Sequence, residues 1–145
     1  MSDLVMLGFT VVHFETELQP EVVQFDGKSD KGMAINCDAY IPGDGKHSVL
    51  RIQISICGYL PGEKPLNERK PFVKVDGEFL FNFESVVELE NSEMEATVKT
   101  VGLQTAIPVL RGLLVGVCNM LNLPPVFSFP PVGPEDIDWD SEEDE

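Results

Sequence analysis

Residues 105–131, TAIPVLRGLLVGVCNMLNLPPVFSFPP, decide the fold of this chain. Within 106–121 the only strongly polar side chains are Arg111 and Asn119. Apolar residues recur there every three or four positions, which predicts a helix. A helix at a domain surface needs one apolar stripe, but this one has two. We therefore expect one stripe to pack on the chain's own domain and the other to be covered by a partner subunit, a membrane or an apolar ligand.

The two stripes lie on different sides of the predicted helix. The first consists of Ile107, Leu110, Leu114, Val117 and Leu121, and the second of Val109, Leu113, Gly116 and Met120. A membrane insertion is not expected, because the 16 residues of 106–121 fall short of the ~20 that a bilayer requires and include Arg111.

Four segments that precede the helix alternate apolar and polar side chains, as strands with one buried face do. They are residues 7–18, 33–41, 48–60 and 72–83. Gly77 falls in the apolar phase of the fourth segment, which indicates a bulge or the close approach of another group. Four strands followed by a helix predict an α+β fold, a four-stranded antiparallel sheet with the long apolar helix on one face.

The beginning of the helical part is also marked in the sequence. Ser92 and Glu95 form a capping-box pattern for a first helical piece. Gly102 is expected to break or kink that piece. Thr105 is expected to cap the main helix, whose first turn tolerates Pro108.

The chain is strongly acidic. It has 145 residues, of which 25 are acidic and 10 basic, and a formal net charge of −15. Eight of the acids lie in 135–145, so 17 acids and 10 bases precede them. We expect one domain over 1–133 and an acidic, disordered tail over 134–145. This charge repels nucleic acid and anionic membranes, and it favours basic proteins and basic unfolded segments as partners.

Residues that usually carry catalysis or bind metals are few and scattered. The cysteines are Cys37, Cys57 and Cys118, and none forms a CxxC pair. His13 and His47 lack neighbouring ligands at metal-binding spacing. Because no nucleophile, base and orienting group occur together, we expect no enzyme, no metal and no cofactor. An odd number of cysteines without an export signal favours the reducing cytoplasm.

The segment after the helix is apolar and rich in proline. Phe127 and Phe129 lie among the prolines of 124–131. They can close the core over the helix, or they can wall an apolar groove that receives an extended peptide. Aromatic residues at strand ends and in the crossover between the first two strands are further candidates for this groove: Phe25, Tyr40 and Tyr59.

The order of these segments resembles the SecB family of protein-export chaperones. The resemblance rests on VLRIQISI (49–56), FVKVDGEFLF (72–81), IPVLRGLLVGV (107–117) and LNLPPVFSFPPV (121–132). It covers roughly residues 7–132 and depends on the order of these segments rather than on one motif.

The resemblance implies a homotetramer, a dimer of dimers that packs largely through the long helix. The predicted oligomer interface is therefore the second stripe: Val109, Leu113, Gly116 and Met120. It also implies a chaperone that holds unfolded preproteins in apolar grooves without ATP and passes them to the SecA motor. A basic surface of that motor would meet an acidic sheet face. The best matches to its contacts are Glu15 and Glu17, with Gln53 and Ser55 as weaker ones.

The chain departs from the family after the proline-rich segment. Family members have a second amphipathic helix there, which flanks the substrate groove, whereas only Ile137 and Trp139 are apolar in 135–145. Two functions therefore remain open. One is an ATP-independent holdase for unfolded polypeptides or for preproteins destined for export. The other is a SecB-like structural or adaptor protein, including a chaperone of a toxin–antitoxin system, without export activity.

Overall fold

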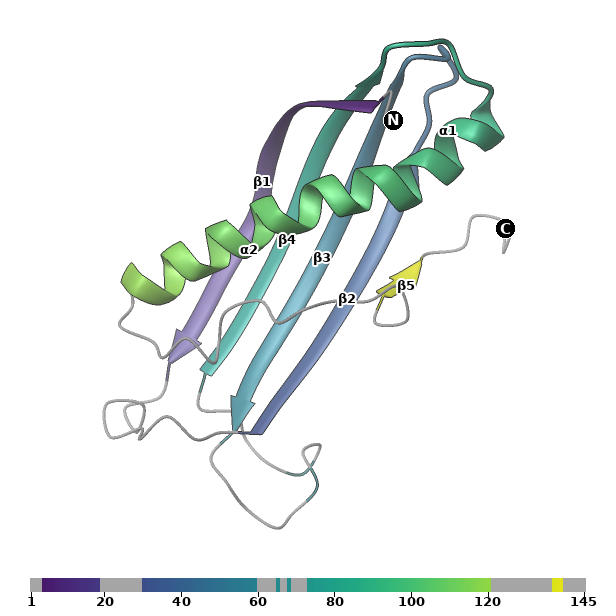
Figure 1. The fold of residues 1–145 in the computed structure, drawn as a ribbon. Helices are drawn as coiled ribbons and strands as arrows, with labels where there is room; N and C mark the ends of the chain where they lie inside the picture. Colours follow the sequence, from purple (N-terminus) through teal and green to yellow (C-terminus); the bar gives the residue numbers. More distant parts are fainter. Residues whose placement is uncertain are drawn as a thin grey trace.

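A long helix lies across one face of a β-sheet in the computed structural model, which describes residues 4–18, 30–59, 73–120 and 137–139 together with Pro65 and Glu68 (Figure 1). The strands are β1 (Leu4–Leu18), β2 (Asp30–Tyr40), β3 (His47–Tyr59), β4 (Val73–Ser85) and β5 (Ile137–Trp139). The helical segments are α1 (Asn91–Thr97), the π-helical η3 (Val98–Gly102) and α2 (Leu103–Met120). The fold is α+β, as predicted.

The sheet has the strand order β1-β4-β3-β2-β5. β1 pairs antiparallel with β4, β4 with β3, and β3 with β2. This arrangement confirms the predicted four-stranded antiparallel sheet. The short strand β5 then pairs in parallel with the free edge of β2, so the complete sheet is mixed and has five strands.

The core lies between the inner sheet face and the helix. β3 and β4 alternate buried and half-buried residues over their length, because they occupy the interior of the sheet and the helix covers one face. Their largest buried side chains are Phe79, Phe81, Phe83, Leu50, Ile52 and Ile56. The helix contributes Met94, Val98, Ala106, Leu110 and Leu114. Leu110 and Leu114 belong to the first predicted stripe, which is therefore confirmed there as the inner side.

β1 does not follow the simple alternation that its sequence indicates. Its ladder with β4 shifts register between Met6 and Gly8, and again between Val11 and His13. Val12 lies at the second shift and is 50% exposed. Extra residues of this kind bend an edge strand and increase its twist.

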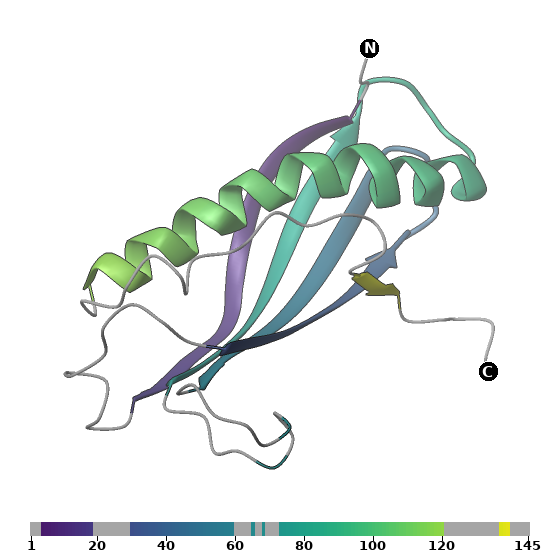
Figure 2. The same cartoon turned by 60° about the horizontal axis from the view of Figure 1, so that its bottom comes forward.

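The helical part is continuous, which corrects the predicted division into two pieces. The N-cap is Glu90, in a capping box with Glu93, and not Ser92. At Gly102 the chain passes from η3 into α2 without a break. The Thr105 hydroxyl donates to the Val101 carbonyl oxygen at 2.9 Å, so it lies inside the helix rather than at its cap. Figure 2 shows the unbroken helix crossing the sheet diagonally.

The helix is also longer than the apolar run 106–121. By length and composition alone, Asn91–Gly116 could cross a membrane, so the argument from a run of 16 residues is wrong. The buried stripe of this helix packs against the sheet, as the core helix of a domain does. Packing on the sheet, and not helix length, accounts for the apolar inner side.

Part of the acidic tail is structured, which corrects the expectation of disorder over 134–145 at these positions. Ile137 is only 8% exposed and joins the core, and Trp139 packs against it. The two apolar residues alternate with Asp138, so a strand can turn both of them towards the core and leave the carboxylate outside. Composition alone could not reveal this, because the strand depends on the free edge of β2.

Candidate functional site

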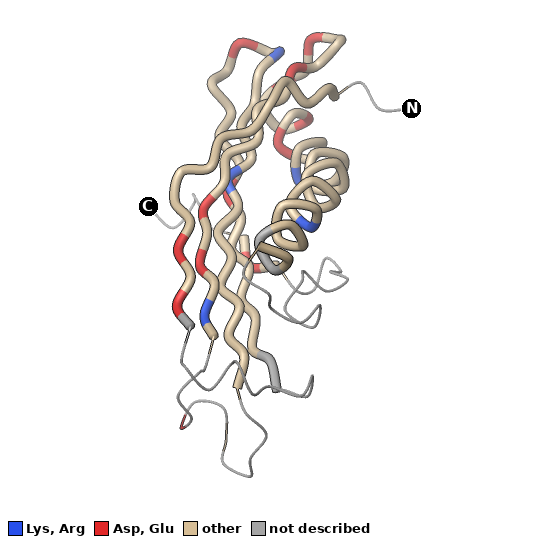
Figure 3. Tube along the Cα trace, turned by 90° about the vertical axis from the view of Figure 1, so that its left-hand side faces the viewer, with Lys and Arg blue, Asp and Glu red and all other residues tan. Residues whose placement is uncertain are grey.

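The sheet face opposite the helix brings together the residues predicted to contact a partner. Glu15 pairs across the ladder with Asp76, and Asp76 pairs with Ser55. In the neighbouring row Gln53 pairs with Glu78. The four predicted contacts therefore lie on one face: Glu15, Glu17, Gln53 and Ser55. Figure 3 shows the acidic residues along two neighbouring strands near one end of the sheet. We call this region the acidic outer face.

Basic residues neutralise part of the acidic outer face. Arg51 Nε donates to Glu78 Oε2 at 2.7 Å, and this hydrogen bond holds the pKa of Glu78 below its ordinary value. Lys74 Nζ lies 3.7 Å from a carboxylate oxygen of Asp76. Among the described residues no three His, Cys, Asp or Glu side chains cluster as metal ligands. The face is thus suited to meet positively charged side chains rather than a metal ion.

The other end of the same sheet face is apolar. A hollow of about 430 Å³ is lined there mainly by apolar residues such as Leu7, Phe9 and Val49, together with the polar His47, Ser48 and Asn82. Leu7 is 57% exposed. Acidic and apolar surfaces therefore lie at opposite ends of the outer sheet face.

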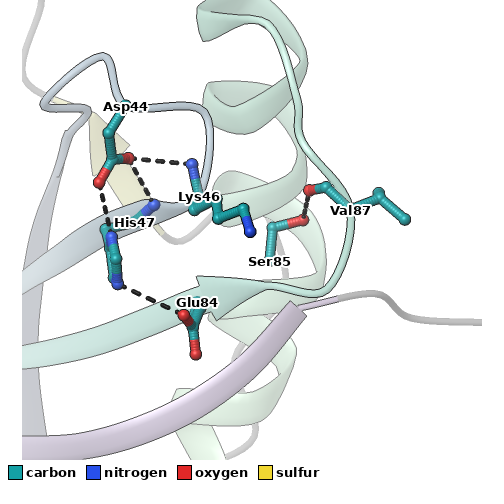
Figure 4. Close-up of polar contacts among 6 residues, drawn as sticks. All are labelled: Asp44, Lys46, His47, Glu84, Ser85 and Val87. Carbon is teal, nitrogen blue, oxygen red and sulfur yellow. Dashed lines mark hydrogen bonds and ion pairs between the residues drawn. The ribbon is translucent and has the colours of Figure 1, made fainter.

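A turn between β2 and β3 borders this apolar end (Figure 4). The backbone N–H groups of Lys46 and His47 donate to Asp44 Oδ1 at 2.9 and 2.8 Å. His47 Nδ1 lies 2.6 Å from Asp44 Oδ2, and His47 Nε2 lies 3.5 Å from Glu84 Oε2. The backbone N–H of His47 is the main cause of the lowered pKa of Asp44, and the Asp44 carboxylate raises the pKa of His47. These contacts stabilise the turn and connect it to β4.

The structure describes two of the five residues predicted to line the peptide groove, Tyr40 and Tyr59. Tyr40 pairs with Val49 at one end of the β2–β3 ladder, and Tyr59 pairs with Asp30 at the other end. Asp30 and Tyr40 are the first and last of the 11 residues of β2, so the two tyrosines lie at opposite ends of the β2–β3 pair. The remaining groove candidates, Phe25, Phe127 and Phe129, lie outside the described residues.

The second helical stripe divides between core and surface. Val109 and Leu113 are half-buried and pack against the core. Met120 is 82% exposed, and a Cβ atom at Gly116 would meet no other atom within 4 Å. Together with the exposed Val115, these positions form an apolar outer side at the C-terminal end of α2. Whether this side is an oligomer interface stays a prediction.

The outer edge of β1 is an apolar surface that sequence reasoning missed. No described strand pairs with this edge. Five of its apolar side chains are 41–57% exposed: Val5, Leu7, Phe9, Val11 and Val12. The sequence over 4–12 could have indicated this surface. Its apolar residues lie on both faces of the strand, whereas a strand with one buried face needs them on one face only.

The opposite edge of the sheet is occupied by the chain itself. Ile137 pairs with Ile35 and Trp139 with Cys37, and both residues of β2 are buried. Lys99 Nζ lies 5.1 Å from the centroid of the Trp139 ring, within the range of a cation–π interaction. The edge of β2 beside Lys99 therefore pairs with an extended segment of the same chain.

Comparison with known proteins identifies the fold. No family model and no curated protein matches the chain. Among solved structures, it is similar to the Mycobacterium tuberculosis Rv1957 SecB-like chaperone in complex with a ChAD peptide from the Rv1956 HigA1 antitoxin. The two share 13% sequence identity with a TM-score of 0.66, over 90% of this chain and 91% of the other. The chain thus has a SecB-like fold, as its sequence predicts.

Proposed function

We propose that this SecB-like chain is an ATP-independent chaperone that binds extended segments of other polypeptides, and that its client is of the antitoxin type. The observation that carries the proposal is the likeness, over nearly the whole chain, to a SecB-like chaperone bound to an antitoxin peptide. Binding rather than catalysis also suits the described residues, whose titratable groups form ion pairs and turns.

Two features of the surface support the binding of polypeptides. The edge of β2 already accepts an extended segment in parallel, which is how sheet edges capture peptides by strand addition. The net charge of −15 attracts basic unfolded segments and raises their rate of association. The two features act together, because the charge brings a client near and the edge gives it backbone partners.

A homo-oligomer is part of the proposal. The long free edge of β1, with apolar side chains on both sides, is a surface that a second copy could cover by edge-to-edge pairing. The C-terminal end of α2 adds the exposed Val115 and Met120. We propose the cytoplasm as the compartment, in keeping with unpaired thiols such as that of Cys57.

An aggregation assay tests the chaperone function. A chemically denatured client is diluted into buffer with the native protein, without ATP, and light scattering is followed. We expect suppression of aggregation near one client per oligomer, and direct binding of an extended antitoxin-derived peptide. An equal mass of a SecB-unrelated acidic protein is the control. If the protein suppresses aggregation no better than this control, the chaperone function is wrong and the structural or adaptor role is left.

Export is a second candidate because of the acidic outer face. Glu15, Asp76 and Glu78 lie together there, as a basic surface of a SecA-type motor would require. In that case the client would be a preprotein, and the acidic outer face would contact the motor rather than the client.

A further inference from the structure

We propose that the edge of β2 beside the α1–η3 end of the helix is the client-binding site, and that the chain's own Ile137–Trp139 occupies this site as a built-in competitor. The inference rests on the proposed function, since it assigns the place where a client segment binds. It differs from the groove expected from sequence, which did not include β5.

The inner side of this site accommodates two apolar side chains in alternation. Ile137 lies beside Ile35, and Trp139 lies beside Cys37, one pleat further along. Both β2 residues are 1% exposed. The side chains of β5 thus complete the core at this edge, while Asp138 between them is exposed. A segment with an aliphatic residue, any residue, and then an aromatic residue reproduces this pattern.

The helix side of this site favours an aromatic residue at the position of Trp139. Lys99 Nζ lies over the Trp139 ring at 5.1 Å from its centroid. Glu95 Oε2 holds the same ammonium group at 3.0 Å, so the cation is positioned even before an aromatic ring arrives. An aromatic residue therefore gains a cation–π contact that an aliphatic residue in its place cannot make.

The described part of the tail, β5, covers only a small part of the edge of β2. β2 runs over 11 residues, whereas β5 pairs with Ile35–Cys37 alone. No other described strand pairs with this edge of β2. A longer extended client can pair with more of β2 than β5 does. These additional hydrogen bonds can offset the high effective concentration that the tether gives to the tail, so the client can displace it. The backbone of the client would run parallel to β2, as β5 does.

The only tryptophan of the chain, Trp139, reports on displacement without any mutation. The ligand is a synthetic peptide with the sequence of residues 132–140 in which Trp139→Phe removes the competing fluorophore. Because the peptide competes with a tethered tail of the same sequence, we expect saturable binding only in the roughly millimolar range, with a red shift of the protein's emission as its own tail is released into water. A control peptide with Ile137→Ser and Trp139→Ser lacks both apolar side chains. It should neither bind nor shift the emission of the protein. Binding of the first peptide without a red shift would overturn the proposal.

A variant of the full chain provides the second test. Ile137→Ser weakens the pairing of the tail with the edge of β2 and leaves β2 and the helix intact. A dye-labelled form of the Trp139→Phe peptide should therefore bind this variant at least ~10-fold more tightly than the wild type. Asp138→Ser, on the exposed side of the same strand, is the matched control and should bind as the wild type does. Trp139→Ser repeats the test if Ile137→Ser is found unfolded by circular dichroism.

The outcomes separate this inference from the proposed function. If Ile137→Ser and Trp139→Ser bind the peptide no better than the wild type while aggregation suppression persists, clients bind elsewhere and only the inference fails. If neither peptide binding nor aggregation suppression is observed, the proposed chaperone function fails with it.

Discussion

At the scale of one residue, the absence of a side chain at Gly77 leaves room for the aromatic rings that pack beside it. The sequence left a bulge and a close approach open at this position, and the structure shows the close approach. The ladder of β4 with β3 runs in regular register through Gly77. A Cβ atom there would lie 2.7 Å from Cε2 of Phe79 and 3.2 Å from Cδ1 of Phe14. Two aromatic rings therefore occupy the space where a side chain would be.

The substitution Gly77→Ala is predicted to destabilise the protein by about 1–3 kcal/mol, as overpacking of a core does. Phe79 is 1% exposed and has little freedom to move away from the new methyl group. Chemical unfolding measures the loss. Gly8→Ala is the control, because a Cβ atom at Gly8 meets nothing within 4 Å. Equal stability of Gly77→Ala and the wild type would show that the rings can shift without cost.

At the scale of elements, the two edges of the sheet differ in what covers them. β5 pairs with β2, whereas no described element pairs with the outer edge of β1. A long edge with exposed apolar side chains is prone to pair with another chain unless something protects it. The edge of β1 carries no Lys or Pro in 4–18 that would discourage such pairing. A second copy of the chain is the partner that we propose.

Leu7→Lys with Val11→Lys is predicted to reduce the native mass to a smaller multiple of 16.0 kDa. Two buried ammonium groups at a self-associating edge would repel each other and lose hydration. Light scattering coupled to gel filtration measures the mass. Val86→Lys is the control, since Val86 is 69% exposed in the connection between β4 and α1. If the double variant keeps the wild-type mass, assembly depends on another surface, of which the end of α2 is the first candidate.

Much of the element structure could be predicted from the sequence. The regular alternation in β3 and β4 was readable because these strands lie inside the sheet and one helix covers one face. The bulges of β1 could not be predicted from the sequence, because this edge strand has apolar residues on both faces and therefore no regular alternation of apolar and polar side chains. The cap at Glu90 was missed because Ser92 offers an equally good local motif, and only the direction in which the chain leaves β4 selects between them.

For the whole molecule, charge is distributed unevenly over the surface. The acidic outer face combines Glu15 and Glu17 of β1 with Asp76 and Glu78 of β4. Pairs of carboxylates on neighbouring strands produce a local negative potential that steers basic ligands. The tail contributes a separate group of eight acids within 135–145.

Glu15→Lys with Glu17→Lys is predicted to slow association with a lysine-rich unfolded peptide by about 10-fold at low salt, and the difference should disappear near ~0.5 M salt. The control is Glu142→Lys with Glu143→Lys, which changes the net charge by the same four units, from −15 to −11. Stopped-flow fluorescence gives both rates. An equal effect of the two double variants would mean that total charge, and not the acidic outer face, governs association.

The sequence alone determined the order of strands and helix, the α+β class, the inner stripe of the helix and the acidic character, because each follows from local periodicity and composition. Tertiary structure decided which surfaces are open. The separation of Tyr40 from Tyr59, the free edge of β1 and the insertion of Ile137–Trp139 beside β2 all depend on pairing between distant segments. Such pairing is set by which strand lies at the edge, and no local pattern records that.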